Sequence, residues 1–553
     1  MVQPAGETIV ADIDVSKLDD QERLGQLGYR QELRRVLGLF DNFSVAFAYL
    51  SPVVGIYSLF VFGAGTGGPA YIWTIPFVVA FMLLVALVFG ELGSHYPVSG
   101  ALYQYGKYSV GPAYGWWIGW IYGVALLATV ASVDTGVVSY LTQLLHNWFG
   151  WNINPLSHST ILIVTVIFIL LQLLLNSVGA SVLGHVARLG VYVETIGTFG
   201  VALALGIHGY NHGFGFLFKT QGEQYVKTNS LSASLGVPID FGGHWLTGAA
   251  LVAVLASVYI FYGFESAGDI AEETKQASRQ IPRAMRLSLI YGGIASFVLV
   301  MGLLLATPAS ASGWASTISL TGGIPAILSV LPSWLQDVFL LLVVIAFFSC
   351  GTAVQAAGSR VAYAYGRDGA LPGGNVLRKI SPRFKTPINA LLIGTVVPIL
   401  FTLLVNVNPS HNVKILWFTY PANVNALTAL VSFATSGIYL AFLLTVIGSG
   451  IARARGWKPE GSFRLGKWGW PVTIVAGAYL LFMFLNIIWP SGLASPRGIL
   501  YNLDWITLVV MAVILLVGLV VYLIAQPGRR LAEHVHDATE PTGAELGEHE
   551  PAS

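Results

Sequence analysis

One apolar stretch near the middle of the chain, Tyr259-Ile-Phe-Tyr-Gly-Phe-Glu-Ser-Ala-Gly-Asp-Ile-Ala-Glu-Glu273, decides the fold. Its first half is apolar enough to cross a membrane, yet it contains Gly263 and Glu265. A carboxylate at that depth is costly and should face protein or water rather than lipid. A glycine beside aromatic residues in mid-span predicts a helix that breaks and exposes backbone groups, which is tolerated only where the break lines a cavity. We therefore expect one half of a binding site in this stretch.

The composition indicates a membrane protein with many spans. The 553 residues are 55% hydrophobic and 10% charged, whereas a soluble globular protein carries about 25% charged residues. The net charge of +1 points to neither nucleic acid nor an acidic partner. The single cysteine, Cys350, excludes internal disulfides and a cysteine-based metal site. Residues 1–36 are polar and do not resemble a cleavable signal peptide, so the first apolar span must serve as the insertion signal.

Apolar segments of spanning length recur twelve times along the chain. With the N-terminus inside, the outer loops hold only Lys219, Lys227, Lys414 and Arg497 of the 28 basic residues. This bias predicts that both termini are cytoplasmic. The expected spans are 39–63, 71–93, 112–145, 160–180, 186–209, 247–270, 287–307, 337–363, 387–406, 421–449, 470–489 and 503–525.

The chain divides into three expected parts. Residues 1–36 form a cytoplasmic N-terminal tail, residues 37–525 form the membrane domain, and residues 526–553 form a cytoplasmic tail. The last part is rich in Pro, Gly, Ala and Glu, a composition that predicts disorder.

Span 1 carries a second expected break, in Ser51-Pro-Val-Val-Gly-Ile-Tyr57. Pro52 removes a backbone donor and disfavours a helical conformation at the residue before it. Spans 1 and 6 lie five spans apart, an odd offset, so the second copy would be inverted in the membrane. Interrupted helices at matching positions of two inverted halves point to a transporter site. The alternative is that Pro and Gly only kink both helices, since both are common in membrane spans.

The expected fold is therefore an all-α membrane protein of about twelve helices. Two inverted five-helix repeats would occupy residues 37–209 and 247–449, followed by extra spans in residues 470–525. Unwinding would free N–H groups in span 1, which bind a carboxylate, and carbonyl groups in span 6, which bind an ammonium group. A zwitterion suits such a site better than a sugar or an inorganic ion.

Three spaced motifs resemble those of amino-acid permeases in the amino acid–polyamine–organocation superfamily. Phe261-Tyr-Gly-Phe-Glu265, continuing to Arg279-Gln-Ile-Pro-Arg-Ala284, resembles the span 6 signature of that family. Residues Glu91–Tyr103 resemble its second-span motif, and residues Ser359–Pro372 its motif at the end of span 8. The form of Ser51–Tyr57 departs from the Gly-Ser-Gly pattern of cationic amino-acid members. It is more similar to the amino acid/choline branch, which includes transporters for gamma-aminobutyrate and choline.

The resemblance covers spans 1 to 10 and implies the inverted-repeat fold first described for a bacterial leucine transporter. It implies alternating access and secondary, usually proton-linked, import of an amino acid or related amine across the plasma membrane, with neither enzymatic activity nor a cofactor. The alternatives are a choline or polyamine carrier, sodium coupling, or exchange. Carried over by position, the carboxylate side would be lined by Ser51, Pro52, Val53, Val54, Gly55, Ile56 and Tyr57, and the ammonium side and gate by Phe261, Tyr262, Gly263, Phe264 and Glu265.

Several polar residues within the spans have both a functional and a structural interpretation. Glu265 could neutralise an amine or carry a proton, or it could brace the broken helix through backbone N–H groups. Glu194 lies in span 5, which in relatives frames an ion site or carries a titratable group, so it is the preferred coupling candidate. Asp134 could meet a cationic group, but its late position in span 3 favours an anchor near the outer interface. Gln355 and Asn425 could bind substrate or join helices.

Other functional classes lack support in the sequence. A channel or sensor on the same fold would need a carbonyl filter or a ring of charge, and neither is visible. A membrane enzyme or an ATP-driven pump would need a nucleophile elbow, an HExxH pair or a Walker A motif, and none is present. The eleven histidines show no metal-ligand spacing.

Overall fold

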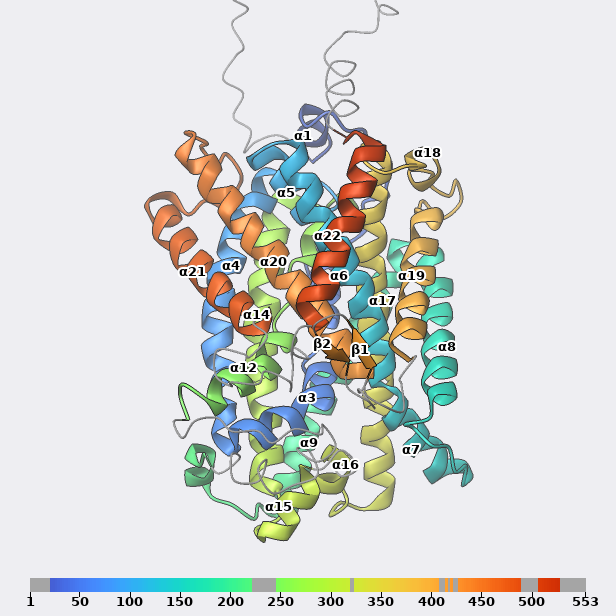
Figure 1. The fold of residues 1–553 in the computed structure, drawn as a ribbon, viewed down its shortest axis with the longest axis vertical. Helices are drawn as coiled ribbons and strands as arrows, with labels where there is room; N and C mark the ends of the chain where they lie inside the picture. Colours follow the sequence, from blue (N-terminus) through green and yellow to red (C-terminus); the bar gives the residue numbers. More distant parts are fainter. Residues whose placement is uncertain are drawn as a thin grey trace, which may run out of the picture.

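The structure is a computed structural model that describes residues 20–220, 245–318, 323–406, 413–415, 418–420, 426–488 and 506–527. This part of the chain is almost entirely helical and forms one bundle (Figure 1). Eleven helical segments are long and apolar enough to cross a membrane, and the short apolar helix α12 (Ala249–Ile260) contributes to a twelfth crossing. Strands β1 (Val413–Ile415) and β2 (Phe418–Tyr420) form one small antiparallel pair. The predicted class, an all-α membrane protein of about twelve helices, is confirmed.

The first repeat opens with an interrupted helix. Helices α2 (Leu39–Leu50) and α3 (Pro52–Gly67) are its two halves, separated at Ser51. The other spans of this repeat are α4 (Thr74–His95), α6 (Pro112–Gly136) with its continuation α7 (Val138–Phe149), α8 (His158–Ser177) and α9 (Ala180–His208).

The second repeat also opens with an interrupted helix. Helix α12 ends at Ile260, and α13 (Ser266–Asp269) resumes the span after a non-helical stretch. The other spans of this repeat are α14 (Ala277–Ala306), α17 (Ser333–Arg367), α19 (Ile388–Asn406) and α20 (Ala426–Ala454), and the two extra spans are α21 (Gly469–Ile488) and α22 (Ile506–Ala525).

Short helices cover the two ends of the bundle. Figure 1 places α1 (Asp20–Gln26), α5 (Ala101–Ser109) and α18 (Gly374–Leu377) at one end and α15 (Ala311–Thr317) and α16 (Gly323–Leu328) at the other. Helix α1 and the C-terminal end of α22 lie at the same end, as an even number of crossings requires. The remaining short elements are the 3-10 turns η1 (Pro69–Trp73), η2 (Phe214–Phe218), η3 (Ala271–Glu273) and η4 (Gly466–Trp468).

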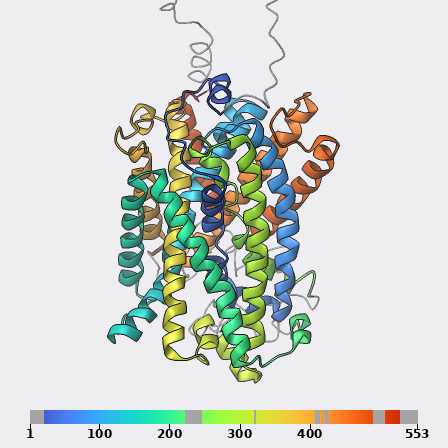
Figure 2. The same ribbon diagram turned by 180° about the vertical axis from the view of Figure 1, so that it is seen from behind.

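The interrupted helices lie at the centre of the bundle, whereas the last helix lies at its edge. The apolar window of the first span is 89% buried, while that of α22 is only 17% buried. Figure 2 shows α2 between α17 and α14, and α9 completes its surroundings. Polar and glycine residues in span 1 are therefore shielded from lipid, which is the condition under which a broken helix is tolerated.

Candidate functional site

Span 1 is interrupted at Ser51, whose φ of +39° and ψ of +90° lie outside the right-handed helical region. Pro52 begins α3 and has no N–H, so the next N–H groups need partners from outside the helix. Val54 N–H donates to the Ser51 hydroxyl at 3.2 Å, and Val53 N–H donates to a Glu194 carboxyl oxygen at 3.5 Å. The N–H groups that the sequence predicts for a substrate carboxylate thus contact the protein's own oxygens in this structure.

The interruption of span 6 contacts that of span 1. Gly263 has a φ of +104°, and a Cβ at this position would lie 2.9 Å from the backbone nitrogen of Leu50. At a second contact between the two spans, a Cβ at Gly55 of α3 would lie 2.5 Å from Cγ1 of Ile260, the last residue of α12. Because Gly263 has no side chain, it can adopt this left-handed conformation and let the two backbones approach so closely. The two breaks that the sequence predicts therefore form a single region.

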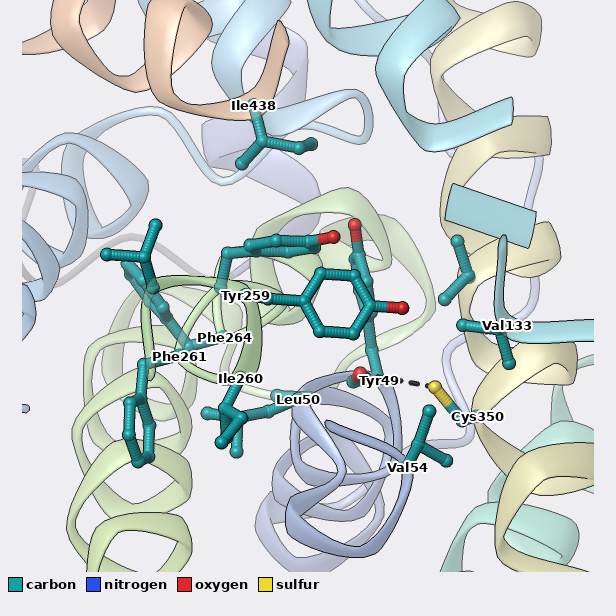
Figure 3. Packing of buried hydrophobic residues seen from close by; sticks show 14 of the residues in the cluster. Tyr49, Leu50, Val54, Val133, Tyr259, Ile260, Phe261, Phe264, Cys350 and Ile438 are labelled. Carbon is teal, nitrogen blue, oxygen red and sulfur yellow. Dashed lines mark hydrogen bonds between the residues drawn. The ribbon is translucent and has the colours of Figure 1, made fainter. Parts of the chain in front are cut away.

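Tyrosine rings gather where the two breaks meet (Figure 3). Tyr262 makes edge-to-face contacts with Tyr49 and Tyr259, at centroid distances of 6.0 and 5.7 Å. The Tyr259 hydroxyl lies 3.3 Å from that of Ser132 on α6, and the Cys350 thiol on α17 donates to the Tyr49 carbonyl at 3.3 Å. These side chains present ring faces and hydroxyl groups, so the region is both aromatic and polar.

Glu265 braces the broken helix, as one of the two interpretations of the sequence predicts. One carboxyl oxygen accepts from Gly263 N–H at 2.8 Å, and the other lies 3.3 Å from the Tyr122 hydroxyl of α6. The Gly263 carbonyl accepts from both the N–H and the hydroxyl of Ser266, at 3.1 and 2.7 Å. This carbonyl, which we expected to face an ammonium group, is therefore already hydrogen bonded.

Among the other residues predicted to line the site, Tyr57 and Phe264 pack against neighbouring helices. Tyr57 stacks edge to face on Tyr140 of α7 at 5.2 Å. Phe264 contacts Phe89 of α4 and Phe442 of α20, at 6.0 and 5.6 Å, and so turns toward those helices. All of the remaining predicted lining residues are buried, namely Pro52, Val53, Val54, Gly55, Ile56, Phe261 and Tyr262.

Asp134 and Gln355 join helices beside the breaks. Asp134 is buried and accepts a hydrogen bond of 2.6 Å from Gln172 of α8, and its carboxyl lies against Gly351. Gly351 follows Cys350, the partner of Tyr49, so Asp134 lies deeper than the outer interface where we expected it. Gln355 accepts from Asn176 of α8 at 3.0 Å and donates to the Ile169 carbonyl at 3.2 Å. Asn425 lies outside the described residues.

Comparison with known proteins identifies the family. The family model described as amino acid permease matches residues 40–522. The chain belongs to the amino acid permease family. The Amino-acid permease BAT1 of Arabidopsis thaliana is 28% identical over 86% of this chain and 89% of its own. The GABA-specific permease of Saccharomyces cerevisiae is 24% identical over 87% of this chain and 80% of its own.

A solved structure has the same fold. That of MhsT in complex with L-phenylalanine has a TM-score of 0.57 at 14% identity, and the match covers 82% of this chain and 98% of that one. This likeness supports the inverted-repeat fold. The family match makes the permease a membrane transporter rather than an enzyme and confirms the predicted superfamily.

Buried ion pairs connect span 6 of the permease to span 8 at the end of the bundle that carries α1. Arg360 of α17 donates to both carboxyl oxygens of Glu273, at 3.1 and 2.8 Å, and both side chains are 1% exposed. About two turns further along α17, Arg367 pairs with Glu272 at 2.8 Å. These two ion pairs tie the end of span 6 to the end of span 8.

Asp368, directly after α17, forms a second polar centre at the same end. It accepts hydrogen bonds from Lys107 at 2.7 Å, Tyr103 at 2.8 Å and Tyr29 at 3.0 Å. Burial by itself would raise the pKa of Asp368, but the charges of Lys107 and Arg367 offset this and hold it below the ordinary value. Asp368 is therefore a charged anchor for the segment that precedes span 1.

Two residues that contact the inner half of span 6, Tyr122 and Arg360, were not predicted from the sequence. Arg360 follows Ser359 within the span 8 motif, and an arginine inside an apolar span is itself a signal that a buried carboxylate lies nearby. Tyr122 gave no such signal, because its role depends on how span 3 packs against span 6. That packing is a tertiary contact that the apolar pattern of span 3 does not encode.

Proposed function

We propose that this permease is a secondary active transporter that imports an amino acid or a related amine by alternating access, coupled to protons, across the plasma membrane. The observation that carries this proposal is the contact between the two interrupted helices at Gly263 and Leu50. Discontinuous helices place backbone N–H and carbonyl groups at the centre of the membrane, where a zwitterion finds a partner for each charge.

The contact of Glu194 with the start of α3 suggests how a proton is coupled to the substrate. The carboxyl of Glu194 lies at Val53 N–H, the position expected for a substrate carboxylate. Two carboxylates cannot share this site at low cost, because like charges repel strongly in a buried environment. Protonation of Glu194 would weaken its contact with Val53 and allow the substrate carboxylate to take its place.

The tyrosine cluster favours an amine of modest size as a second candidate substrate class. Ring faces attract ammonium and quaternary ammonium groups, and Tyr49, Tyr259 and Tyr262 present such faces at the breaks. Choline, polyamines and gamma-aminobutyrate therefore belong in the test beside the standard amino acids, and sodium coupling and exchange are the alternatives to proton symport.

The direct test is uptake into proteoliposomes containing the purified permease. Labelled amino acids, gamma-aminobutyrate, choline and polyamines are offered under separate proton and sodium gradients. We expect uptake of at least one zwitterion that a proton gradient accelerates and a sodium gradient does not. Transport of none of these compounds would contradict the proposed substrate class, and acceleration by sodium alone would contradict proton coupling.

A further inference from the structure

A single tyrosine hydroxyl lies between two buried carboxyl groups on the inner half of span 6. The Tyr122 hydroxyl is 3.3 Å from Glu265 Oε1 and 2.7 Å from Asp269 Oδ2. All three side chains are fully buried. Glu265 and Asp269 are four residues apart, so they lie on the same face of this part of span 6. Tyr122 reaches that face from α6.

The hydrogens available to this group are too few for two ionised carboxylates. A tyrosine hydroxyl carries one hydrogen, and an ionised carboxylate carries none. The shorter distance indicates that Tyr122 donates to Asp269, and a lone pair of its oxygen then faces Glu265 Oε1. The other oxygen of Glu265 already accepts from Gly263 N–H at 2.8 Å. A proton on Glu265 Oε1 would convert the unfavourable approach of two lone pairs into a hydrogen bond.

A positive charge near the pair already balances another carboxylate. Arg360 of α17 acts on Asp269 through space, but its guanidinium donates to both oxygens of Glu273. The other titratable side chains that face the pair are the phenols of Tyr105 from α5 and Tyr49 from α2. Within the described residues, no ion pair involves Glu265 or Asp269, and Asp269 Oδ1 has no hydrogen-bond partner. If Glu265 and Asp269 were both ionised, two negative charges without a cation partner would lie on either side of one hydroxyl group. That arrangement is costly in a buried site.

We propose that Glu265, Tyr122 and Asp269 hold one shared proton and relay it along the inner half of span 6. In the relay, the Glu265 carboxylic acid gives its proton to the Tyr122 oxygen while the Tyr122 hydroxyl gives its own proton to Asp269. One O–H bond breaks and one forms at each step, so Tyr122 is unchanged and the proton has moved from Glu265 to Asp269. The relay starts at the residue that braces the break and ends one turn further toward the inner ion pairs.

The presence of the proton follows from the geometry alone, whereas its use in transport rests on the proposed function. In that account, Glu194 acts at the start of α3, on the outer half of span 1, and the relay acts on the inner half of span 6. The Asp269 carboxyl accepts its hydrogen bond from Tyr122 rather than from a basic side chain.

Infrared difference spectroscopy of the purified permease at neutral pH tests for the proton directly. We expect the wild type to show a C=O stretching band of a buried protonated carboxylic acid that both Glu265→Gln and Asp269→Asn remove or shift. Tyr122→Phe should shift the same band, because it deletes the bridging hydroxyl without deleting a carboxyl group. Asp337→Asn, at a carboxylate near the outer end of α17, is the matched control and should leave the band in place.

Two outcomes of this experiment would overturn the proposal. If neither Glu265→Gln nor Asp269→Asn alters any protonated-acid band, both groups are ionised and no proton is shared. If added sodium changes the carboxylate bands of the wild type but not those of Asp269→Asn, a metal cation occupies the site in place of the proton. Circular dichroism of each variant shows whether it has folded, and Tyr122→Phe provides a second test if a carboxyl variant fails to fold.

A transport measurement tests the role of the relay separately. In proteoliposomes, Asp269→Asn should lower the ratio of proton-driven uptake to counterflow by about tenfold, while Asp337→Asn should keep the wild-type ratio. An unchanged ratio in Asp269→Asn would overturn a role for the relay in coupling. If the wild type transports no compound, the proposed function fails, but the infrared result still decides whether the proton is present.

Discussion

Two separate features exclude a side chain at position 263, where the sequence has Gly263. Its φ of +104° is unfavourable for other residues, and a Cβ would approach Leu50 N to 2.9 Å. Gly209 has a similar φ of +117°, but a Cβ there would have no neighbour within 4 Å. We predict that Gly209→Ala costs only backbone strain, about 1–2 kcal/mol, and that Gly263→Ala also abolishes uptake by forcing the breaks apart. Melting temperatures and proteoliposome uptake of both variants measure this, and similar uptake by the two would contradict it.

Glu194 is the residue on which proton coupling depends in the proposed mechanism. Glu194→Gln retains the shape of the side chain but has no proton to exchange, so accumulation driven by a pH gradient should fall about tenfold more than exchange does. Asp134→Asn is the matched control, since asparagine can still accept the hydrogen bond from Gln172 and should leave pH-driven accumulation intact. Uptake and exchange are measured with the same labelled substrate. Undiminished pH-driven uptake in Glu194→Gln would remove this residue from the mechanism.

At the scale of elements, the pair between Arg360 and Glu273 ties the end of span 6 to span 8. Removal of one partner of a buried pair leaves the other charge uncompensated, which costs about 3–5 kcal/mol. We predict a large fall in melting temperature for Arg360→Gln. The fall should be smaller for Arg367→Gln, because the Glu272 carboxylate that this change leaves without its cation still accepts from Ser99 N–H at 3.1 Å. Equal shifts in the two variants would show that this backbone hydrogen bond does not offset the loss of the cation.

The anchor at Asp368 predicts how acid affects the same end of the bundle. A carboxyl group whose pKa is lower in the folded than in the unfolded protein adds stability at neutral pH and loses it as the pH falls through the folded pKa. The pKa of Asp368 is lowered below 3.8 in this way. Asp368→Asn should therefore melt below the wild type at neutral pH, and the difference should vanish in acid below 3.8. A difference that stays constant with pH would mean that the charge of Asp368 is not what stabilises this end.

The positions of the breaks could be predicted from sequence because glycine and proline restrict the backbone locally. Pro52 and Gly263 each act through their own conformational limits, and the structure interrupts both helices beside them. The partners of the exposed backbone groups could not be predicted in the same way. Val53 N–H meets Glu194, which is 141 residues away in sequence, because α9 packs against α3. Nothing in the apolar pattern of either helix encodes that contact.

At the scale of the whole molecule, the orientation in the membrane can be tested with cysteines, because the single native Cys350 is buried. The concentration of basic residues predicts that the loop between α20 and α21 is cytoplasmic and that the loop after α14 faces outward. Ser462 and Ser310 are exposed in these two loops. A membrane-impermeant thiol reagent applied to intact cells should label Ser310→Cys but not Ser462→Cys. Labelling of Ser462→Cys alone would invert the predicted topology.

The overall architecture could be predicted because long apolar segments, their number and their basic flanks are properties of the sequence itself. The distribution of the spans between centre and edge depends on packing, which leaves α22 at the edge although it is one of the most apolar helices. Span 3 illustrates the same limit. It is an apolar segment in the sequence, but in the structure it delivers Tyr122 to span 6 and Ser132 to the tyrosine cluster.

In the proposed mechanism, a zwitterion crosses the membrane by alternating access at the meeting point of the two broken helices. Counterflow in proteoliposomes is the decisive measurement, with internal unlabelled amino acid driving the entry of labelled amino acid in the absence of ion gradients. We expect saturable counterflow in the wild type and none in Gly263→Ala. Uptake that does not saturate, that carries single-channel currents, or that persists in Gly263→Ala would rule out this mechanism.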